Sequence, residues 1–301
     1  MRASLPPSQI VPGHRHYDQL SAIRAELISR AGSLAAIERE IPTLLRETID
    51  DVIQTPRTGR RSYDELEKTE KTYIGTRVEI MIRSFFRLPK GRLDLLILGR
   101  DADVKFTIGN NWMMPREVLN HPCLLLAADE ERARCYFGLF IADDDYLSLG
   151  SNQDKKRTVS AIGFAHIMWL LNAHPLQPNF WRTIPHASAV EIASQATGNE
   201  RVMALFREVQ NRAIPREVIE ATARQKDFMR RIRADGGRGT RDLLAREGIL
   251  LLSGKYDSVL INRLHLGEVG PSEFISHSPR NDREREIVRA FGITLGELRL
   301  L

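Results

Sequence analysis

Three charged side chains interrupt two neighbouring runs of strand-forming residues near the middle of the sequence. Asp94 lies in the run 93–98, and Asp103 and Lys105 lie in the run 103–108. Aspartate and lysine are uncommon in strands, so their presence among leucine, isoleucine, valine and phenylalanine suggests a chemical role. Two carboxylates can hold Mg²⁺ through oxygen ligands, and a nearby lysine can stabilise charge that develops on a phosphoryl group. These residue types are suited to phosphodiester hydrolysis.

The two runs are expected to form a β-hairpin, because the intervening Gly99-Arg100-Asp101 is typical of a turn. Asp103 and Lys105 are two residues apart and therefore share one face of their strand. A turn on Gly99-Arg100 would place Asp94 opposite Lys105. A four-residue loop would shift the pairing by two and keep Asp94 on the same face. The structural alternative is an exposed strand edge guarded by charges.

A fourth candidate, Glu79, lies in the helical segment that precedes the hairpin. Residues 62–86 read as one long helix with Ser62 as its N-cap. Glu79 occupies the most apolar turn of that helix, where a charged carboxylate is costly unless it is paired or binds a metal. We therefore expect Glu79 to complete an acidic pocket. The alternative is a glutamate on a narrow polar stripe of a buried helix.

The elements around these residues indicate an α/β (α+β) first domain. Helices are expected at 17–32 and 33–52, followed by a basic loop at 54–61 that contains proline and glycine. A second strand pair is expected at 123–127 and 132–142. The stretch 172–179 has two prolines and no periodicity, so we place the domain boundary there. The domains are then 1–172 and 173–301.

The second domain is expected to be mainly helical. Helices at 200–212, from 214 onward and at 225–234 precede a strand at 248–254, which is the outline of a winged helix-turn-helix. On the helix 225–234, Phe228 and Ile232 would face a core. Gln225 precedes Lys226, Arg230 and Arg233, and these three cations lie roughly 140–200° from Phe228. Such a helix could enter a DNA groove; the alternative is a solvated cationic face.

The charge distribution agrees with this division. The formal net charge is +5, and residues 151–301 carry 23 basic and 17 acidic side chains, whereas residues 1–150 carry 21 and 22. A basic segment beside a near-neutral half indicates a polyanion-binding module. Eight of the basic residues lie between 224 and 246: Arg224, Lys226, Arg230, Arg231, Arg233, Arg238, Arg241 and Arg246.

Composition excludes several other classes. The chain has 301 residues and is 42% hydrophobic, so it can build a core. No apolar run reaches the ~18 residues of a membrane span, and the start lacks the apolar stretch of a signal peptide. The only cysteines, Cys123 and Cys135, make a disulfide framework or zinc site unexpected, so we expect a cytoplasmic protein. The His14-Arg15-His16 arm is expected to be mobile, and the histidines show no ligand spacing.

At these residues the chain resembles the NaeI-type restriction endonucleases. The resemblance covers roughly residues 40 to 255. Its motifs are Arg57-Thr-Gly-Arg60, Lys68-Thr-Glu-Lys-Thr72, Gly75-Thr-x-Val-Glu-Ile80, the Asp103-x-Lys105 hairpin, Arg201-Val, Leu205-Phe-Arg207, Asp227-Phe-Met-x-Arg-x-Arg233 and Glu247-Gly-Ile249.

The resemblance implies a nuclease domain of the PD-(D/E)-x-K kind followed by a CAP-like helix-turn-helix domain. It implies a Mg²⁺-dependent homodimer that cuts both strands of DNA, with a cognate methyltransferase in the same restriction–modification system and a second DNA site as allosteric effector. Thr69 would assist Glu79, Asp94, Asp103 and Lys105 in the site. Arg57 and Arg60 would contact DNA.

Two other functions remain open at the level of sequence. A DNA-binding transcriptional regulator with a degenerate nuclease domain would keep the basic segment and lose the chemistry. A nicking endonuclease of the mismatch-repair type would share the hairpin and the helix glutamate but cut one strand as a monomer.

Overall fold

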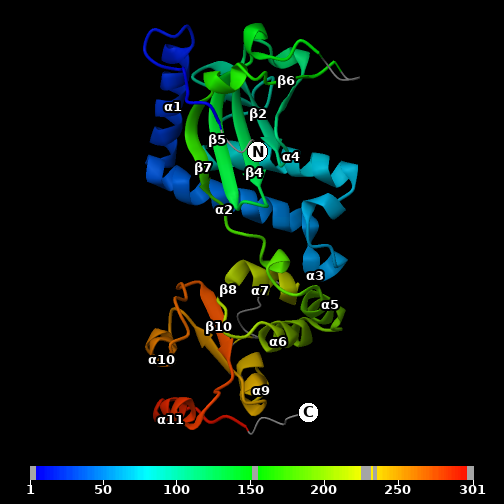
Figure 1. Cartoon of the computed structure of the whole chain (residues 1–301), viewed down its shortest axis with the longest axis vertical. Coiled ribbons are helices and arrows are strands. Elements are labelled where there is room, and N and C mark those ends of the chain that lie inside the picture. Colours follow the sequence, from blue (N-terminus) through cyan, green and yellow to red (C-terminus); the bar gives the residue numbers. More distant parts are fainter. Residues whose placement is uncertain (1–4, 151–154, 225–231, 233–235, 297–301) are drawn as a thin grey trace. The chain divides into compact units, whose positions relative to one another are not determined.

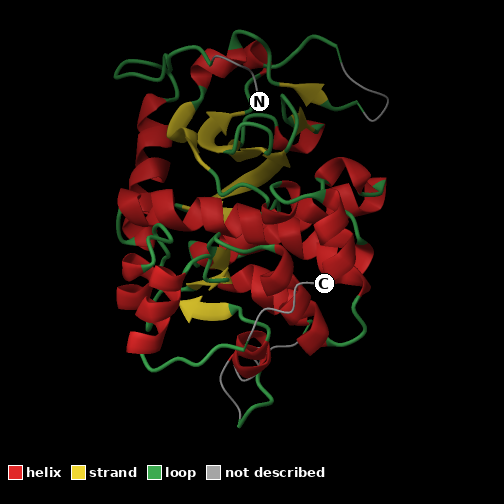
Figure 2. Cartoon of the chain, turned by 60° about the horizontal axis from the view of Figure 1, so that its bottom comes forward, coloured by secondary structure: helices red, strands yellow, loops and turns green. Residues whose placement is uncertain are grey.

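The computed structural model describes residues 5–150, 155–224, 232 and 236–296. Contacts divide the chain into two compact units: residues 1–52 with 63–179, and residues 53–62 with 180–301. The second unit therefore takes in the basic loop 54–61, which lies far from the rest of that unit in the sequence. Both units contain helices and strands, so the chain is mixed α/β (Figure 2).

The first unit has three long helices, which are grouped with its main sheet in Figure 1. The helices expected at 17–32 and 33–52 are confirmed as α1, Tyr17–Ala31, and α2, Leu34–Ile53. Gly32 ends α1 with a φ of 87°, a left-handed conformation that glycine adopts without steric penalty. The third helix is α4, Lys68–Phe85.

The expected N-cap of the third helix is wrong. Helix α4 starts at Lys68 rather than after Ser62, and a short 3₁₀ turn, Tyr63–Glu65, precedes it. A reciprocal pair of hydrogen bonds sets the start: the side chain of Glu67 accepts from the backbone of Glu70, and the side chain of Glu70 accepts from the backbone of Glu67. This capping box satisfies two donors at once, which a lone serine cannot do.

Five strands form the main sheet of the first unit in the order β1-β2-β4-β5-β7. Strands β2 and β4 run parallel, and the other neighbours are antiparallel. Every residue of β4 is buried, so the middle of the sheet lies inside the core. The strands are β1, Leu95–Ile97; β2, Arg100–Thr107; β4, Pro122–Asp129; β5, Arg134–Ile141; and β7, Met168–Pro175, with a separate pair formed by β3, Met113–Met114, and β6, Arg157–Thr158.

The stretch expected to be a linker, 172–179, is partly a strand. Strand β7 runs through Pro175, and the first unit extends to Asn179. The prolines misled the prediction because proline removes a ladder donor, yet β7 is an edge strand, where one missing donor is tolerated.

The second unit has helices around a three-stranded antiparallel sheet of order β8-β10-β9. The expected helix at 200–212 is α6 and the expected strand at 248–254 is β9. The elements are α3, Thr55–Thr58; α5, His186–Ser194; α6, Gly198–Glu208; β8, Ile214–Pro215; α7, Arg216–Ala223; α9, Thr240–Arg246; β9, Leu250–Ser253; α10, Ser258–Arg263; β10, Glu273–His277; and α11, Asp282–Ala290.

Most of the helix expected at 225–234 lies outside the described residues. Ile232, which the pattern assigned to a core, is 2% exposed and belongs to the core of the second unit. Among the described helices, none has the length and apolar character that crossing a bilayer requires.

Candidate active site

The β1–β2 hairpin carries three of the four acidic-pocket candidates. Leu95 pairs with Ala102 and Ile97 pairs with Arg100, so the turn is Leu98-Gly99. Both turn residues have positive φ, 51° and 74°, as a type I′ hairpin turn requires. Continuing this register by one pair puts Asp94 opposite Asp103. The expected pairing of Asp94 with Lys105 is therefore wrong by two residues, but the strand period of two keeps Asp94 on the expected face.

Two hydrogen bonds hold Asp94 in place at the start of the hairpin. Its carboxylate Oδ2 accepts from the backbone N–H of Val104 at 2.8 Å. Its backbone oxygen accepts from Nη1 of Arg83 at 3.1 Å. The first bond aims the carboxylate at the strand that carries Asp103 and Lys105, and the second connects Asp94 to helix α4.

Asp103 and Lys105 form an ion pair on one face of β2. Asp103 is only 5% exposed, and burial raises its pKa to about 6 despite the opposing effect of Lys105. The neighbouring Asp94 adds to this rise. Burial acts to lower the pKa of Lys105, but the Asp103 carboxylate outweighs it and raises that pKa. Lys105 is thus a cation at neutral pH.

Glu79 faces this pair from helix α4, which packs against β2. Burial raises the pKa of Glu79 to about 7, and the charge of Asp94 raises it further, while Lys105 and Arg83 oppose the rise. The expectation that Glu79 joins Asp94 and Asp103 electrostatically agrees with this geometry. In the apolar turn around Glu79, Val78 and Ile82 are fully buried, but Ile80 is 47% exposed and Met81 is 36% exposed, so the expectation that the whole turn is buried holds for one face only.

The donor set of this pocket fits Mg²⁺. The described residues contain no ready group of three or more His, Cys, Asp or Glu side chains arranged around a cation. Mg²⁺ usually takes only one or two protein carboxylates and completes its shell with waters and substrate phosphates. Oδ2 of Asp103 is buried and lies against the ammonium group of Lys105, and the Asp94 carboxylate lies beside Asp103. Adjacent hard oxygen donors of this kind suit a small divalent cation.

Thr69 does not lie with the other candidates. It is exposed in the first turn of α4, ten residues before Glu79, which corresponds to ~15 Å along the helix axis.

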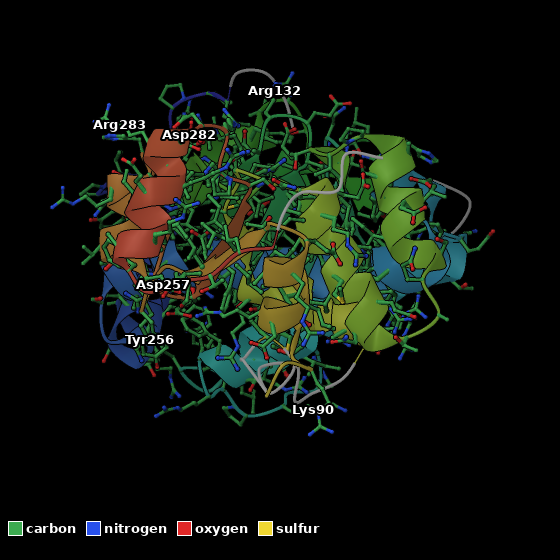
Figure 3. The ribbon with its side chains drawn as sticks, turned by 90° about the horizontal axis from the view of Figure 1, so that it is seen from below. Lys90, Arg132, Tyr256, Asp257, Asp282 and Arg283 are labelled. Carbon is green, nitrogen blue, oxygen red and sulfur yellow. The ribbon has the colours of Figure 1, made fainter. Side chains whose placement is uncertain are left out.

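The loop that connects α4 to β1 carries Lys90, whose side chain points outward in Figure 3.

Two residues near the pocket were not found from the sequence. Arg83 lies one helical turn after Glu79, a spacing of four that could have revealed it. Cys123 is the partner of Asp103 in the parallel β2–β4 register, which the sequence did not predict. Burial raises the pKa of the Cys123 thiol, and Asp103 raises it further, so this thiol stays neutral and is not a thiolate ligand or nucleophile.

The candidate DNA-contacting residues that are described lie in the second unit. Arg57 is exposed at the end of α3, and Arg60 is partly buried just after it. The guanidinium of Arg224 donates to the backbone oxygen of Pro56. Burial lowers the pKa of Arg201, and so do Arg224 and Arg57, which shows that these cations lie close together. Four further candidates fall outside the described residues: Gln225, Lys226, Arg230 and Arg233.

Arg201 has a structural role within this basic cluster. It is 5% exposed and donates to the backbone oxygens of Thr222 at 3.0 Å and Gln195 at 2.9 Å. These bonds connect the ends of helices α5 and α7. Arg57 is exposed, so solvent, and therefore a ligand, can reach it.

Comparison with known proteins identifies the family. A family model described as restriction endonuclease NaeI matches residues 37–286, a range that includes the hairpin, Glu79 and most of the second unit. The type II restriction enzyme NaeI of Lentzea aerocolonigenes is 36% identical over 244 residues, which cover 78% of this chain and 75% of that protein. The chain therefore belongs to the NaeI restriction endonuclease family and is a type II restriction enzyme, a site-specific deoxyribonuclease.

Proposed function

We propose that the chain cleaves both strands of DNA at a specific sequence, with Mg²⁺ as cofactor, and leaves 5′-phosphate and 3′-hydroxyl ends. The observation that carries this proposal is the hairpin pocket, in which two adjacent carboxylates and an ion-paired lysine share one face of a strand pair. Phosphodiester hydrolysis needs such a set, because negative charge accumulates on the phosphoryl oxygens in the transition state.

Asp94 and Asp103 would hold Mg²⁺, with Glu79 as a further carboxylate. When bound, the metal supplies Lewis-acid stabilisation of the phosphoryl oxygens and lowers the pKa of a coordinated water. Lys105 is protonated, because the Asp103 carboxylate raises its pKa by more than burial lowers it. It therefore serves as a fixed cation beside the phosphoryl group and orients the attacking oxygen by hydrogen bonding, and it does not serve as a general base.

The hydrolysis proceeds by in-line attack of water on phosphorus. A bond forms between the water oxygen and phosphorus, and the bond from phosphorus to the 3′ oxygen breaks. The attacking water gives up one proton to solvent, the leaving 3′ oxygen takes up one proton from solvent, and the phosphate stays on the 5′ side. Glu79 completes the acidic pocket beside Asp94 and Asp103, whose charges act on it.

We assign the chemistry to the first unit and DNA binding to the second. The units differ from the expected domains 1–172 and 173–301, because residues 53–62 belong to the second unit and residues 173–179 to the first. A PD-(D/E)-x-K fold for the first unit is supported by its sheet with one parallel strand pair and by the helix that presents Glu79. A CAP-like winged helix-turn-helix for the second is supported by short helices beside a small antiparallel sheet. Contacts from Arg57, Arg60, Gln225, Lys226, Arg230 and Arg233 would bind a second DNA site that activates cleavage.

A homodimer follows from the proposed reaction, because one chain supplies one pocket and a duplex has two strands to cut. Host DNA would then need protection, so we also propose a cognate DNA methyltransferase as the partner in a restriction–modification system. Thr69 stays a proposed contributor to the site, one that would need substrate or a partner chain to bring it into contact.

Digestion of supercoiled plasmid tests the proposed function. The purified protein is incubated with Mg²⁺ at low salt and with unmethylated plasmids that together cover a broad range of sequences. Oligonucleotides that carry candidate sites are added in excess to supply the second DNA site. The expected product is linear plasmid with defined ends. Sequencing of the ends should show 5′-phosphates at one recurrent sequence.

The alternative functions predict other products. Open circles alone would favour a nicking enzyme of the mismatch-repair type. Uncut plasmid together with tight, metal-independent binding would favour a transcriptional regulator. Either result would contradict the proposal.

A further inference from the structure

Arg83 connects two parts of the acidic pocket that the sheet does not connect. It lies four residues after Glu79 on α4, so the two side chains share a helix face. Its Nη1 donates to the backbone oxygen of Asp94 at 3.1 Å. Its charge also acts on Glu79, where it opposes the rise in pKa.

Asp94 needs a contact of this kind because the strand ladder does not hold it. The pairing of β1 with β2 begins at Leu95 with Ala102, so Asp94 lies just outside the ladder. Its carboxylate accepts from the N–H of Val104, and the preceding loop is held by Asp101, whose Oδ1 accepts from the N–H groups of Arg92 and Leu93. None of these bonds is made by the backbone oxygen of Asp94. The bond from Arg83 fixes the backbone oxygen, and the two bonds together determine where the carboxylate points.

Arg83 is itself on a well-anchored element. Just after it, Arg87 has a φ of 50°, and the N–H of Leu88 donates to the backbone oxygen of Arg83 at 3.0 Å, which closes the helix end in a Schellman-type arrangement. Arg30 of α1 donates to the backbone oxygens of Phe86, at 3.3 Å, and of Arg87, at 2.9 Å. Side chains on rigid elements position a site more accurately than side chains on loops.

We infer that Arg83 is a positioning residue of the active site, which sets the backbone of Asp94 so that its carboxylate can hold the metal beside Asp103. This inference rests on the proposed function. It adds a residue that acts through the position of Asp94 and whose charge also acts on Glu79.

Removing such a second partner of a metal ligand costs ~10–100-fold in metal affinity or activity. Arg83→Met keeps the length of the side chain and removes both the charge and the donors. We expect the Mg²⁺ concentration for half-maximal cleavage to rise ~10–100-fold, with a smaller loss of rate at saturating Mg²⁺. Arg83→Lys keeps the charge and one donor, and it should recover part of the loss, because lysine lacks the planar fork of arginine.

A second readout does not depend on cleavage. Binding of Mn²⁺ to the protein without DNA, followed by the electron paramagnetic resonance signal of free Mn²⁺, should weaken in Arg83→Met by a similar factor and in Arg83→Lys by less. Arg77→Met is the matched control, because Arg77 lies on the same helix but forms its ion pair with Asp51 at 2.7 Å. That variant should bind Mn²⁺ and cut DNA as the wild type does.

The outcomes separate this inference from the proposed function. If the wild type fails to cut DNA, the proposed function is wrong. If the wild type cuts and the Arg83 variants bind Mn²⁺ and respond to Mg²⁺ like the Arg77 control, the inference is wrong. Should Arg83→Met fail to fold, Arg83→Lys decides: a shift of ~3–10-fold in Mn²⁺ affinity supports the inference, and an unchanged affinity contradicts it.

Discussion

The ion pair between Lys105 and Asp103 sets the charge state of the pocket. A lysine beside a buried carboxylate keeps its proton, whereas the carboxylates Asp103 and Glu79 are held near the point of protonation by burial. An acidic pocket of this kind is poorly stable without a cation, because like charges lie close together in a partly dehydrated environment. The clustered carboxylates of the pocket should therefore lower the stability of the metal-free protein.

Glu79→Gln tests this arrangement through its effect on stability. In the wild type the pKa of Glu79 is raised by burial to about 7 from an ordinary 4.5, so the folded protein binds more protons than the unfolded chain between those values. Stability is therefore lost as pH rises from about 4.5 to about 7. We expect the variant to be more stable than the wild type at pH 8 by ~1–2 kcal/mol, since solvent screens part of the full shift.

Thermal unfolding at pH 4.5, 6 and 8 with a chelator present measures this difference. The variant should unfold a few degrees higher at pH 8 and at the same temperature at pH 4.5. Glu117→Gln, a change at an exposed glutamate, should show no such trend. Equal or lower stability of Glu79→Gln at pH 8 would contradict the electrostatic account.

At the scale of elements, the sequence predicted the hairpin but not its register. The alternation of apolar residues was sufficient to place Asp94, Asp103 and Lys105 on one face. The register depends on the turn, and the turn is Leu98-Gly99 because Leu98 adopts a φ of 51°. Branched apolar residues rarely adopt that conformation, so no local rule could have selected it over Gly99-Arg100.

Other features were missed because they depend on contacts that are distant in sequence. The parallel pairing of β2 with β4, which brings Cys123 beside Asp103, needs a crossover that no local pattern encodes. The proline-containing stretch at 172–175 forms a strand only because β5 is available as a partner. The core positions Val78 and Ile82, by contrast, follow from helical periodicity and were predictable.

The N-terminal arm is ordered by a histidine cluster, contrary to the expectation of a mobile segment. Nε2 of His14 lies 3.0 Å from Nδ1 of His166 and 3.2 Å from the hydroxyl of Tyr146. Nδ1 of His14 accepts from the backbone N–H of His16 at 3.1 Å. This arrangement fixes the neutral tautomer of His14 with its proton on Nε2, and it requires an unprotonated Nδ1 on His166.

Acidification should therefore release the arm. Burial lowers the pKa of His14, and His16 and Arg15 lower it further; burial and the charge of His14 lower the pKa of His166. A histidine whose pKa is lower in the folded protein than in the unfolded chain stabilises the fold above about pH 6.5. This stabilisation is lost as the pH falls below that value. The charged groups that face the cluster are Arg15, His16, Asp143 and Asp145.

Hydrogen exchange of residues 5–16, expressed as protection factors at pH 7.5 and 5.5, measures this release. Protection of the arm should fall at the lower pH, while that of β4 should stay the same. In His14→Gln, residues 5–16 should lose most of their protection at both pH values. Equal protection of the wild-type arm at the two pH values would show that the histidine contacts do not hold it.

At the scale of the whole molecule, charge is divided between the two halves of the sequence. The near-neutral first half contains the acidic pocket, and the basic second half, together with Arg57 and Arg60 of the segment 53–62, carries the cations proposed to bind DNA. Composition could show this division but not that the segment 53–62 belongs with the second unit, because that placement depends on packing of α3 against α5.

Arg57→Ala tests the proposed DNA contact. Each phosphate contact contributes ~0.9 to the slope of log K against log salt concentration. We expect the variant to bind all duplex sequences more weakly, and we expect the magnitude of its slope to be smaller by the ~0.9 that one phosphate contact contributes. Fluorescence anisotropy without Mg²⁺ measures both quantities. Arg39→Ala, which alters an exposed arginine paired with Glu40 in the first unit, should leave the slope unchanged. An unchanged slope for Arg57→Ala would exclude this contact.

Comparing Asp103→Asn with the wild type, on one plasmid that carries the target sites, shows whether the hairpin pocket performs the cleavage. The same preparations are assayed for cleavage with Mg²⁺ and for DNA binding without it. If Asp103 is part of the catalytic pocket, the variant loses at least ~1,000-fold in cleavage rate, while its DNA affinity stays within a few-fold of the wild type. Cleavage by Asp103→Asn at the wild-type rate would contradict the account.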